Sequence, residues 1–260
     1  MIKLIASDLD GTLLRDNKEL FSGFFDIIIR LKEKGIYCAA ASGRQMESLE
    51  SVFEPVKNDV IFIAENGTNI KYFGETIFCS SIDKKYASAL ANEVYSHKNL
   101  DIMTSGLKSA YSKDNELCKA MTKYFKYKMS LVKDPVDVDD EIIKIAVTDL
   151  STHCRKDFGS LHNFMSDYFT ITISGDNCLD FVKKGVSKGS AIRLIQKRVG
   201  ADFHSTAAFG DNFNDIEMFK EAFYSYAMDK ADDGVKKAAR FSGGDNNGDG
   251  VAKEIIKLCF

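Results

Sequence analysis

Hydrophobic residues near the start of the chain alternate between short continuous runs and helix-like spacing. The runs 2–7, 36–41 and 59–64 predict buried strands, because a strand covered on both faces is apolar throughout. Between these runs, apolar residues recur every three or four positions over 20–31 and 46–53, as in amphipathic helices. The alternation predicts an α/β fold with a Rossmann-like, doubly wound parallel sheet and helices on both of its faces.

From about residue 82 the strands become half-polar. Residues 169–174 alternate strictly between apolar and polar side chains, and 142–149 and 178–183 are further short strand candidates. Such strands suit an antiparallel sheet with one solvated face. The accompanying helices are expected over 82–97, 114–125 and 155–166. This pattern predicts an inserted α+β domain.

The first pattern returns near Gly185. A helix is expected over 187–200, with Ser187 as its cap and Gly200 as its end, followed by a strand over 205–210 and a helix over 213–222. The expected domains are a core formed by 1–81 with 185–260 and an inserted domain formed by 82–184.

Polar side chains directly follow three of the predicted core strands. These segments are Asp8-Leu9-Asp10-Gly11-Thr12, Ser42-Gly43-Arg44 and Asp211-Asn212-Phe213-Asn214-Asp215. In an open α/β sheet, ligands bind at the carboxyl ends of the strands, so these segments are expected to share one crevice. Folding alone would not place two neighbouring carboxylates after a buried strand. The pattern therefore predicts a site that requires negative charge.

Clustered carboxylates are tolerable when a divalent cation neutralises them. Asp8, Asp211 and Asp215 can supply oxygen ligands, and an all-oxygen site favours Mg²⁺.

Groups that favour an anion occur beside these carboxylates. Ser42 and Gly43 precede a predicted helix, where a hydroxyl and backbone N–H groups favour an anion. Lys188, at the start of another helix, adds a point charge for phosphate. Metal, lysine, hydroxyl and a free carboxylate together indicate phosphoryl transfer with aspartate as the nucleophile.

The charge balance indicates a small-molecule partner. With 35 Lys and Arg against 38 Asp and Glu, the net charge is −3, which gives no footprint for nucleic acid or an anionic membrane. No apolar run reaches the length of a membrane span, and the one before Asp8 is too short for a signal peptide. The sequence shows no sign of an obligate protein partner, and we expect a cytoplasmic protein.

The cysteines agree with that compartment. No two cysteines of the chain form a C-x-x-C pair, and the four histidines lack metal-ligand spacing. The six cysteines are at positions 38, 79, 118, 154, 178 and 259. Reduced, mostly packed thiols are therefore expected.

The polar segments resemble the four motifs of the haloacid dehalogenase superfamily of phosphatases. The matching residues are D-x-D-G-T at 8–12, S-G-R at 42–44, K-G at 188–189 and G-D-x-x-N-D at 210–215. In addition, AENG at 64–67, KGVSKGSA at 184–191 and DGVA at 249–252 resemble the Cof-type subgroup, whose α+β cap follows the third strand. The resemblance covers the whole core, but only the position and size of the cap.

The resemblance implies a role for each motif residue. It implies Asp8 as nucleophile, Asp10 as general acid and then base, and Lys188 with Ser42 as holders of the transferring phosphoryl group. It implies Mg²⁺ ligation by Asp8, by the Asp10 carbonyl and by Asp211, with Asn214 and Asp215 supporting Lys188 and the metal. Taken together, the candidates are Asp8, Asp10 and Lys188 for catalysis, Gly11, Ser42, Gly43, Arg44 and Asn214 for substrate, and Asp8, Asp10, Asp211 and Asp215 for metal. For Arg44, surface pairing and a role near the site remain equally open.

The leading functional hypothesis is a Mg²⁺-dependent phosphatase of small phosphorylated metabolites, with sugar phosphates as the expected class. A phosphosugar mutase on the same fold would share the chemistry, and nothing in the inserted domain excludes it. A non-catalytic binding module is the third alternative. Such a module is expected to have lost one of Asp8, Asp10, Lys188 or Asp211, and all four are present.

Overall fold

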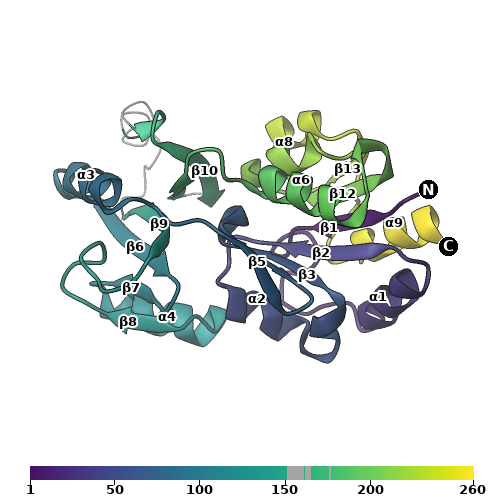
Figure 1. Cartoon of the computed structure of the whole chain (residues 1–260), viewed down its shortest axis with the longest axis horizontal. Helices are drawn as coiled ribbons and strands as arrows, with labels where there is room; N and C mark the ends of the chain where they lie inside the picture. The colour runs from purple at the N-terminus through teal and green to yellow at the C-terminus, as the bar shows by residue number, and fades with distance from the viewer. Residues whose placement is uncertain (151–160, 162–164, 176) are drawn as a thin grey trace. The chain divides into compact units, whose positions relative to one another are not determined.

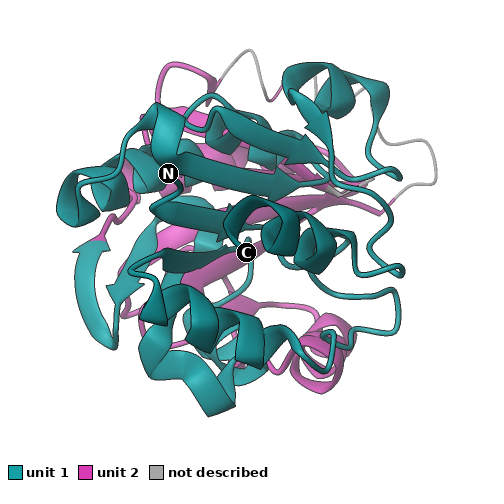
Figure 2. Cartoon of the chain, turned by 90° about the vertical axis from the view of Figure 1, so that its right-hand side faces the viewer, with its two compact units in different colours: residues 1–78, 187–260 teal, residues 79–186 magenta. Residues whose placement is uncertain are grey.

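The computed structural model describes residues 1–150, 161, 165–175 and 177–260, which form two compact units (Figure 1). Unit 1 consists of Met1–Phe78 and Ser187–Phe260, and unit 2 consists of Cys79–Val186 (Figure 2). No helix among these residues is both long and apolar enough to cross a membrane.

Unit 1 is built on an eight-stranded sheet with the order β14-β13-β12-β1-β2-β3-β4-β5. Its strands are β1 Leu4–Ser7, β2 Tyr37–Ala41, β3 Ile61–Ala64, β4 Asn69–Tyr72, β5 Glu75–Cys79, β12 Thr206–Gly210, β13 Tyr224–Ala227 and β14 Phe241–Ser242. Neighbouring strands from β14 to β3 are parallel, and β4 pairs antiparallel with β3. The predicted α/β fold with a parallel core sheet is confirmed.

Helices cover both faces of this sheet. They are α1 Phe24–Glu33, α2 Met46–Val52, α6 Lys188–Val199, α7 Ile216–Phe219, α8 Asp233–Ala238 and α9 Gly250–Cys259. Ile5 of β1 packs in a core cluster with α1, α2 and α9, whereas Leu4 and Ala6 pack in a second cluster with α6, α7 and α8. Successive strand side chains point to opposite faces, so burial on both sides requires an apolar residue at every position. This explains the continuous apolar runs.

The sequence pattern missed β13, β14 and α8, and it also missed the hairpin formed by β4 and β5. Its turn lies at Phe73 and Gly74, which both have positive φ angles (48° and 88°). The helix expected over 213–222 is also different, because residues Phe213–Asp215 form a 3₁₀ turn before the short α7. The carboxylate of Asp215 accepts hydrogen bonds from the backbone N–H groups of Asp211 and Asn212 (2.9 and 3.0 Å), which tightens this turn.

Unit 2 contains a six-stranded sheet with the order β10-β11-β9-β6-β7-β8. Its elements are α3 Lys84–Tyr95, β6 Leu100–Gly106, β7 Ala110–Ser112, α4 Asn115–Phe125, β8 Met129–Leu131, β9 Ile142–Asp149, β10 Phe169–Gly175 and β11 Cys178–Lys183. The pairs are antiparallel except for β7 with β8. Most of the helix expected over 155–166 lies outside the described residues, as does Cys154. The other five cysteines are free thiols.

Candidate active site

Adjacent strands of unit 1 bring the predicted site residues together. Strand β1 lies between β12 and β2, and all three run in the same direction. The backbone N–H of Asp8 donates to the carbonyl oxygen of Phe209 in β12 (2.9 Å), so the segment after β1 starts in register with the end of β12. The carboxyl ends of these strands therefore place Asp8, Ser42 and Asp211 at one edge of the sheet.

A buried lysine joins two of the aspartates. Ser187 caps α6 by accepting a hydrogen bond from the backbone N–H of Ser190, and Lys188 is the first residue of the helix. The Nζ atom of Lys188 donates to Asp8 Oδ1 (2.5 Å) and to Asp215 Oδ1 (2.7 Å). The side chains of Lys188 and Asp215 are fully buried, and that of Asp8 is 10% exposed. The site thus has a fixed positive charge beside the candidate nucleophile.

The pKa values reflect this burial. Burial raises the pKa of Asp8 well above its usual range, and the charge of Lys188 offsets only part of that effect. For Lys188, burial lowers the pKa, but the attraction of Asp215 and Asp8 outweighs it, so the pKa lies above the ordinary value. Lys188 therefore remains a cation at neutral pH, whereas Asp8 gains its proton more readily than an exposed aspartate does.

Asp211 completes a group of three carboxylates. Asp8, Asp211 and Asp215 each offer an oxygen atom within 4.8 Å of the others. The hydroxyl of Thr12 donates to Asp211 Oδ1 (2.7 Å). Burial, followed by repulsion from Asp215, raises the pKa of Asp211 to about 6. Three carboxylates share one lysine here, so the group carries an excess of negative charge.

This donor set fits a divalent cation such as Mg²⁺, which prefers carboxylate and carbonyl oxygens. Both oxygen atoms of Asp215 already accept hydrogen bonds, Oδ1 from Lys188 and Oδ2 from the backbone of Asp211 and Asn212. Asp215 therefore supports Lys188 and the turn around Asp211, while Asp8 and Asp211 have more oxygen positions left for a metal ion. Gly11 is required beside this group, because a Cβ atom there would lie 2.5 Å from Asp211 Oδ2.

Asp10 has a different environment. Arg44 holds its carboxylate through two hydrogen bonds, from Nε to Oδ2 (2.6 Å) and from Nη2 to Oδ1 (2.7 Å), and Lys18 Nζ donates to Oδ1 (2.9 Å). Burial raises the pKa of Asp10, but the hydrogen bonds and charges of Arg44 and Lys18 lower it more, so the net pKa is below the ordinary value. Asp10 is therefore an ionised carboxylate in this state. The predicted contact of Arg44 with substrate stays a prediction.

The Ser42-Gly43-Arg44 segment is fastened to the turn that follows β3. The backbone N–H of Arg44 donates to Ser42 Oγ (3.2 Å), and the backbone N–H of Asn66 donates to the Ser42 carbonyl (3.0 Å). Asn214 Nδ2 donates to Asn66 Oδ1 (3.1 Å). The candidate phosphate contacts from β2 and from the segment after β12 thus meet through Asn66.

Three residues of this site were not assigned roles from the sequence. Thr12 belongs to the first motif and Asn66 to the AENG segment, so position in a motif was an available signal for both. Lys18 gave no such signal. It lies in the loop after β1 with a left-handed backbone (φ 68°), a conformation that a lysine seldom adopts. Only the folded loop brings its ammonium group to Asp10.

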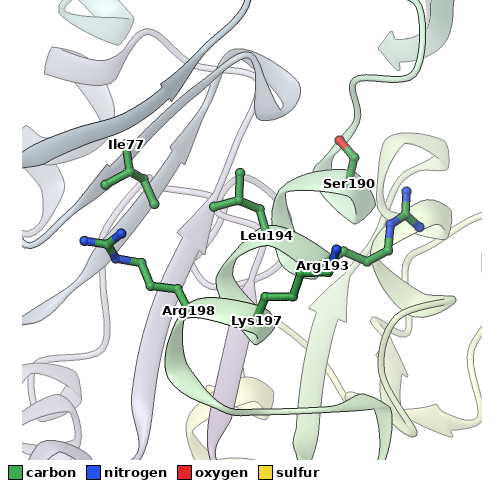
Figure 3. Close-up of a pocket in the computed structure, with 6 residues that line it drawn as sticks. All are labelled: Ile77, Ser190, Arg193, Leu194, Lys197 and Arg198. Carbon is green, nitrogen blue, oxygen red and sulfur yellow. The ribbon is translucent and has the colours of Figure 1, made fainter.

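A separate groove of about 590 Å³ runs along α6 beside β5 (Figure 3). Its lining residues are Ile77, Ser190, Arg193, Leu194, Lys197 and Arg198, and the predicted site residues are not among them. The guanidinium group of Arg198 stacks over the ring of Tyr72 (4.6 Å), and Arg193 forms an ion pair with Glu221. The groove is a basic surface on the same helix that supplies Lys188.

Comparison with known proteins gives a consistent picture over the whole chain. Residues 5–255 match the family model for haloacid dehalogenase-like hydrolases. The chain is 30% identical over 266 residues to the 5-amino-6-(5-phospho-D-ribitylamino)uracil phosphatase YbjI of Escherichia coli K12, covering 99% of this chain and 96% of that protein. A Bacillus subtilis 168 phosphatase with the same named substrate is 26% identical over 254 residues, covering 98% of this chain and 94% of that protein. A crystal structure from Streptococcus mutans UA159 superimposes with a TM-score of 0.91 at 26% identity, covering 99% of each chain.

Proposed function

Because the chain belongs to the haloacid dehalogenase superfamily and is a phosphatase, we propose that it hydrolyses small phosphate monoesters through an aspartyl-phosphate intermediate. The observation that carries this proposal is the group of Asp8, Lys188, Asp211 and Asp215 at the carboxyl edge of the parallel strands. A binding module would not require a carboxylate beside a fully buried lysine. Asp8 is the proposed nucleophile.

In the proposed first step, an Asp8 carboxylate oxygen attacks phosphorus and the ester P–O bond breaks. Lys188 and the Ser42 hydroxyl are proposed to stabilise the negative charge on the phosphoryl oxygens. Lys188 contributes a charge that is already in place and dehydrated, so little reorganisation is needed as the reaction proceeds. The products are the phosphorylated Asp8 and the departing alkoxide.

Asp10 is proposed to handle the protons of both steps. It donates a proton to the departing alkoxide, and it then accepts one from the water that attacks the phosphorylated Asp8. The contacts of Arg44 and Lys18 hold Asp10 ionised, which suits the second task. For the first task, Asp10 has to gain a proton when substrate binds. Lys18 is the partner that can withdraw most easily, because its side chain is 53% exposed whereas that of Arg44 is 10% exposed.

We further propose that Mg²⁺ is the cofactor, held by Asp8, Asp211 and the backbone carbonyl of Asp10, with Asp215 in support. When bound, the ion neutralises the carboxylate group and polarises the phosphoryl oxygens. The all-oxygen donor set and the excess negative charge of Asp8, Asp211 and Asp215 support this assignment.

Sugar and sugar-alcohol phosphates are the proposed substrate class, with residues 82–184 as the cap that selects among them. Two relatives are named for a phosphate ester of a ribityl chain, which supports a polyol phosphate as substrate. Small phosphorylated metabolites also agree with the absence of a basic excess in the composition, because the net charge is −3.

The test is phosphate release in Mg²⁺ from a panel that contains 5-amino-6-(5-phospho-D-ribitylamino)uracil, hexose phosphates, nucleotides and p-nitrophenyl phosphate. We expect turnover that EDTA abolishes and Mg²⁺ restores, with Ca²⁺ a poor substitute because its coordination is larger and looser. Full activity in excess chelator would contradict the metal assignment. Conversion of a hexose phosphate into an isomeric phosphate without free phosphate would favour the mutase alternative.

A further inference from the structure

The turn after β3 has an unusual backbone. Glu65, Asn66 and Gly67 have consecutive positive φ angles of 49°, 58° and 102°. Glu65 and Asn66 are also buried, with 1% and 2% of their surfaces exposed. L-residues rarely adopt this conformation, and such outliers persist only where the surrounding structure enforces them, often at functional sites. The turn therefore calls for a functional explanation.

This turn is fastened to two parts of the candidate active site. The backbone N–H groups of Glu65 and Asn66 donate to the carbonyl oxygens of Arg44 and Ser42, both at 3.0 Å. On its other side, a Cβ atom at Gly67 would lie 2.4 Å from the carbonyl oxygen of Ser187, the cap of α6. The left-handed turn thus lies against both the Ser42–Arg44 segment and the start of the helix that carries Lys188.

The side chain of Asn66 links the candidate phosphate contacts to each other. Its Oδ1 atom accepts a hydrogen bond from Asn214 Nδ2 (3.1 Å). A Cβ atom at Gly43 would lie 3.2 Å from the same oxygen, so the Gly43 backbone packs directly on the Asn66 carboxamide. The carboxamide therefore lies between Gly43 and Asn214, which come from distant parts of the sequence.

We propose that Asn66 is a positioning residue for the phosphate site: it holds the Asn214 carboxamide in the orientation that binds the phosphoryl group. This inference rests on the proposed phosphatase function. Asparagine meets three requirements at once, because it tolerates a left-handed backbone, offers an acceptor oxygen and carries no charge. Glycine would lack the acceptor, and aspartate would add a negative charge near the bound phosphate.

The experiment is a double-mutant cycle read out by inorganic phosphate as a competitive inhibitor in Mg²⁺. The variants are Asn66→Gly, Asn214→Ala and the two combined. Glycine keeps the left-handed backbone, so Asn66→Gly removes the side chain with the least disturbance of the turn. We expect Asn66→Gly to raise the Ki for phosphate about 2- to 12-fold, the range given by loss of one neutral hydrogen bond. The double variant is expected to match Asn214→Ala alone within about 2-fold.

Additive effects of the two substitutions, or an unchanged Ki in Asn66→Gly, would overturn the inference, because a residue that acts through Asn214 has no effect once Asn214 is gone. Phe73→Gly is the matched control. Phe73 also has a left-handed backbone (φ 48°), but it lies at the opposite end of β4. The Ki of the Phe73→Gly variant for phosphate is therefore expected to equal that of wild type.

If Asn66→Gly does not fold, Asn66→Asp provides the decision. Aspartate adopts the same backbone and keeps an acceptor oxygen for Asn214. In the Asn66→Asp background, Asn214→Ala is expected to raise the Ki again by about 2- to 12-fold, and no effect there would refute the inference. Wild-type protein without phosphatase activity would instead refute the proposed function, so the two failures are distinguishable.

Discussion

Replacement of Asp211 by asparagine is expected to stabilise the metal-free protein while abolishing its activity. Asp211 lies in the group with Asp8 and Asp215, and its side chain accepts a hydrogen bond from Thr12 (2.7 Å). Asparagine has nearly the same shape and keeps an oxygen for the Thr12 hydroxyl. The change therefore removes one negative charge from a crowded, mostly buried group with little change in packing.

The size and sign of the effect follow from the pKa of Asp211. Burial, together with repulsion from Asp215, raises this pKa from 3.8 to about 6. The native state thus binds more protons than the unfolded state between these values, and the free energy of unfolding falls as the pH rises through them. Above pH 6, Asp211 is ionised in both the native and the unfolded state, and the full cost of its burial lowers the free energy of unfolding. This cost is at most about 3 kcal/mol, because the two pKa values differ by about two units. Because Asp211 retains some hydration, the expected effect is smaller than this ceiling. We expect Asp211→Asn to raise the free energy of unfolding by about 2 kcal/mol at pH 8 and by about half as much at pH 5.

The assay is denaturant and thermal unfolding of wild type and variant in EDTA at pH 8 and pH 5. A gain of about 2 kcal/mol corresponds to a rise in Tm of about 4–8 °C. Asp233→Asn is the control, because Asp233 is exposed and its replacement should change the stability by less than about 0.5 kcal/mol. In Mg²⁺ we expect wild type to be more stable than Asp211→Asn, since the ion stabilises only a protein that binds it. A variant less stable than wild type at pH 8 in EDTA, or a gain that does not depend on pH, would refute the electrostatic reasoning.

Three further predictions concern neighbouring residues. Lys188→Met should abolish turnover and lower the free energy of unfolding by about 3–5 kcal/mol, because it leaves two buried carboxylates without their partner. A loss of stability no larger than that caused by Lys197→Met, at an exposed position of the same helix, would contradict this prediction. Asp10→Asn should release a burst of about one nitrophenolate per enzyme from p-nitrophenyl phosphate and then turn over slowly, since nitrophenolate leaves without a proton; the same burst in Asp8→Asn would show that Asp8 is not the nucleophile. Gly189→Ala should destabilise the protein, because the new Cβ atom would lie 2.3 Å from a backbone oxygen of α7. This clash is expected to outweigh the helix propensity of alanine, which exceeds that of glycine by about 1 kcal/mol. An unchanged Tm would refute the close packing of α6 on α7.

The sequence by itself determined the α/β class of the core, with its parallel sheet, and the residue types of the candidate site. Continuous apolar runs mark strands that are buried on both faces, and this burial is a property of each strand's own residues. Asp8, Ser42 and Asp211 each follow such a run directly, so the parallel arrangement was sufficient to predict that they share one edge of the sheet. The missed hairpin β4–β5 is short and partly exposed, and such a segment carries little periodicity.

The tertiary structure alone decided which side chains are partners. Spacing along the chain could not show that Lys188 lies between Asp8 and Asp215, or that Arg44 and Lys18 hold Asp10 ionised. Long, flexible side chains such as these reach their partners across loops whose path depends on packing elsewhere in the molecule. Burial and charge balance, and therefore the pKa of each carboxylate, exist only after those loops have folded, because a pKa shift requires both the loss of water and the approach of other charges.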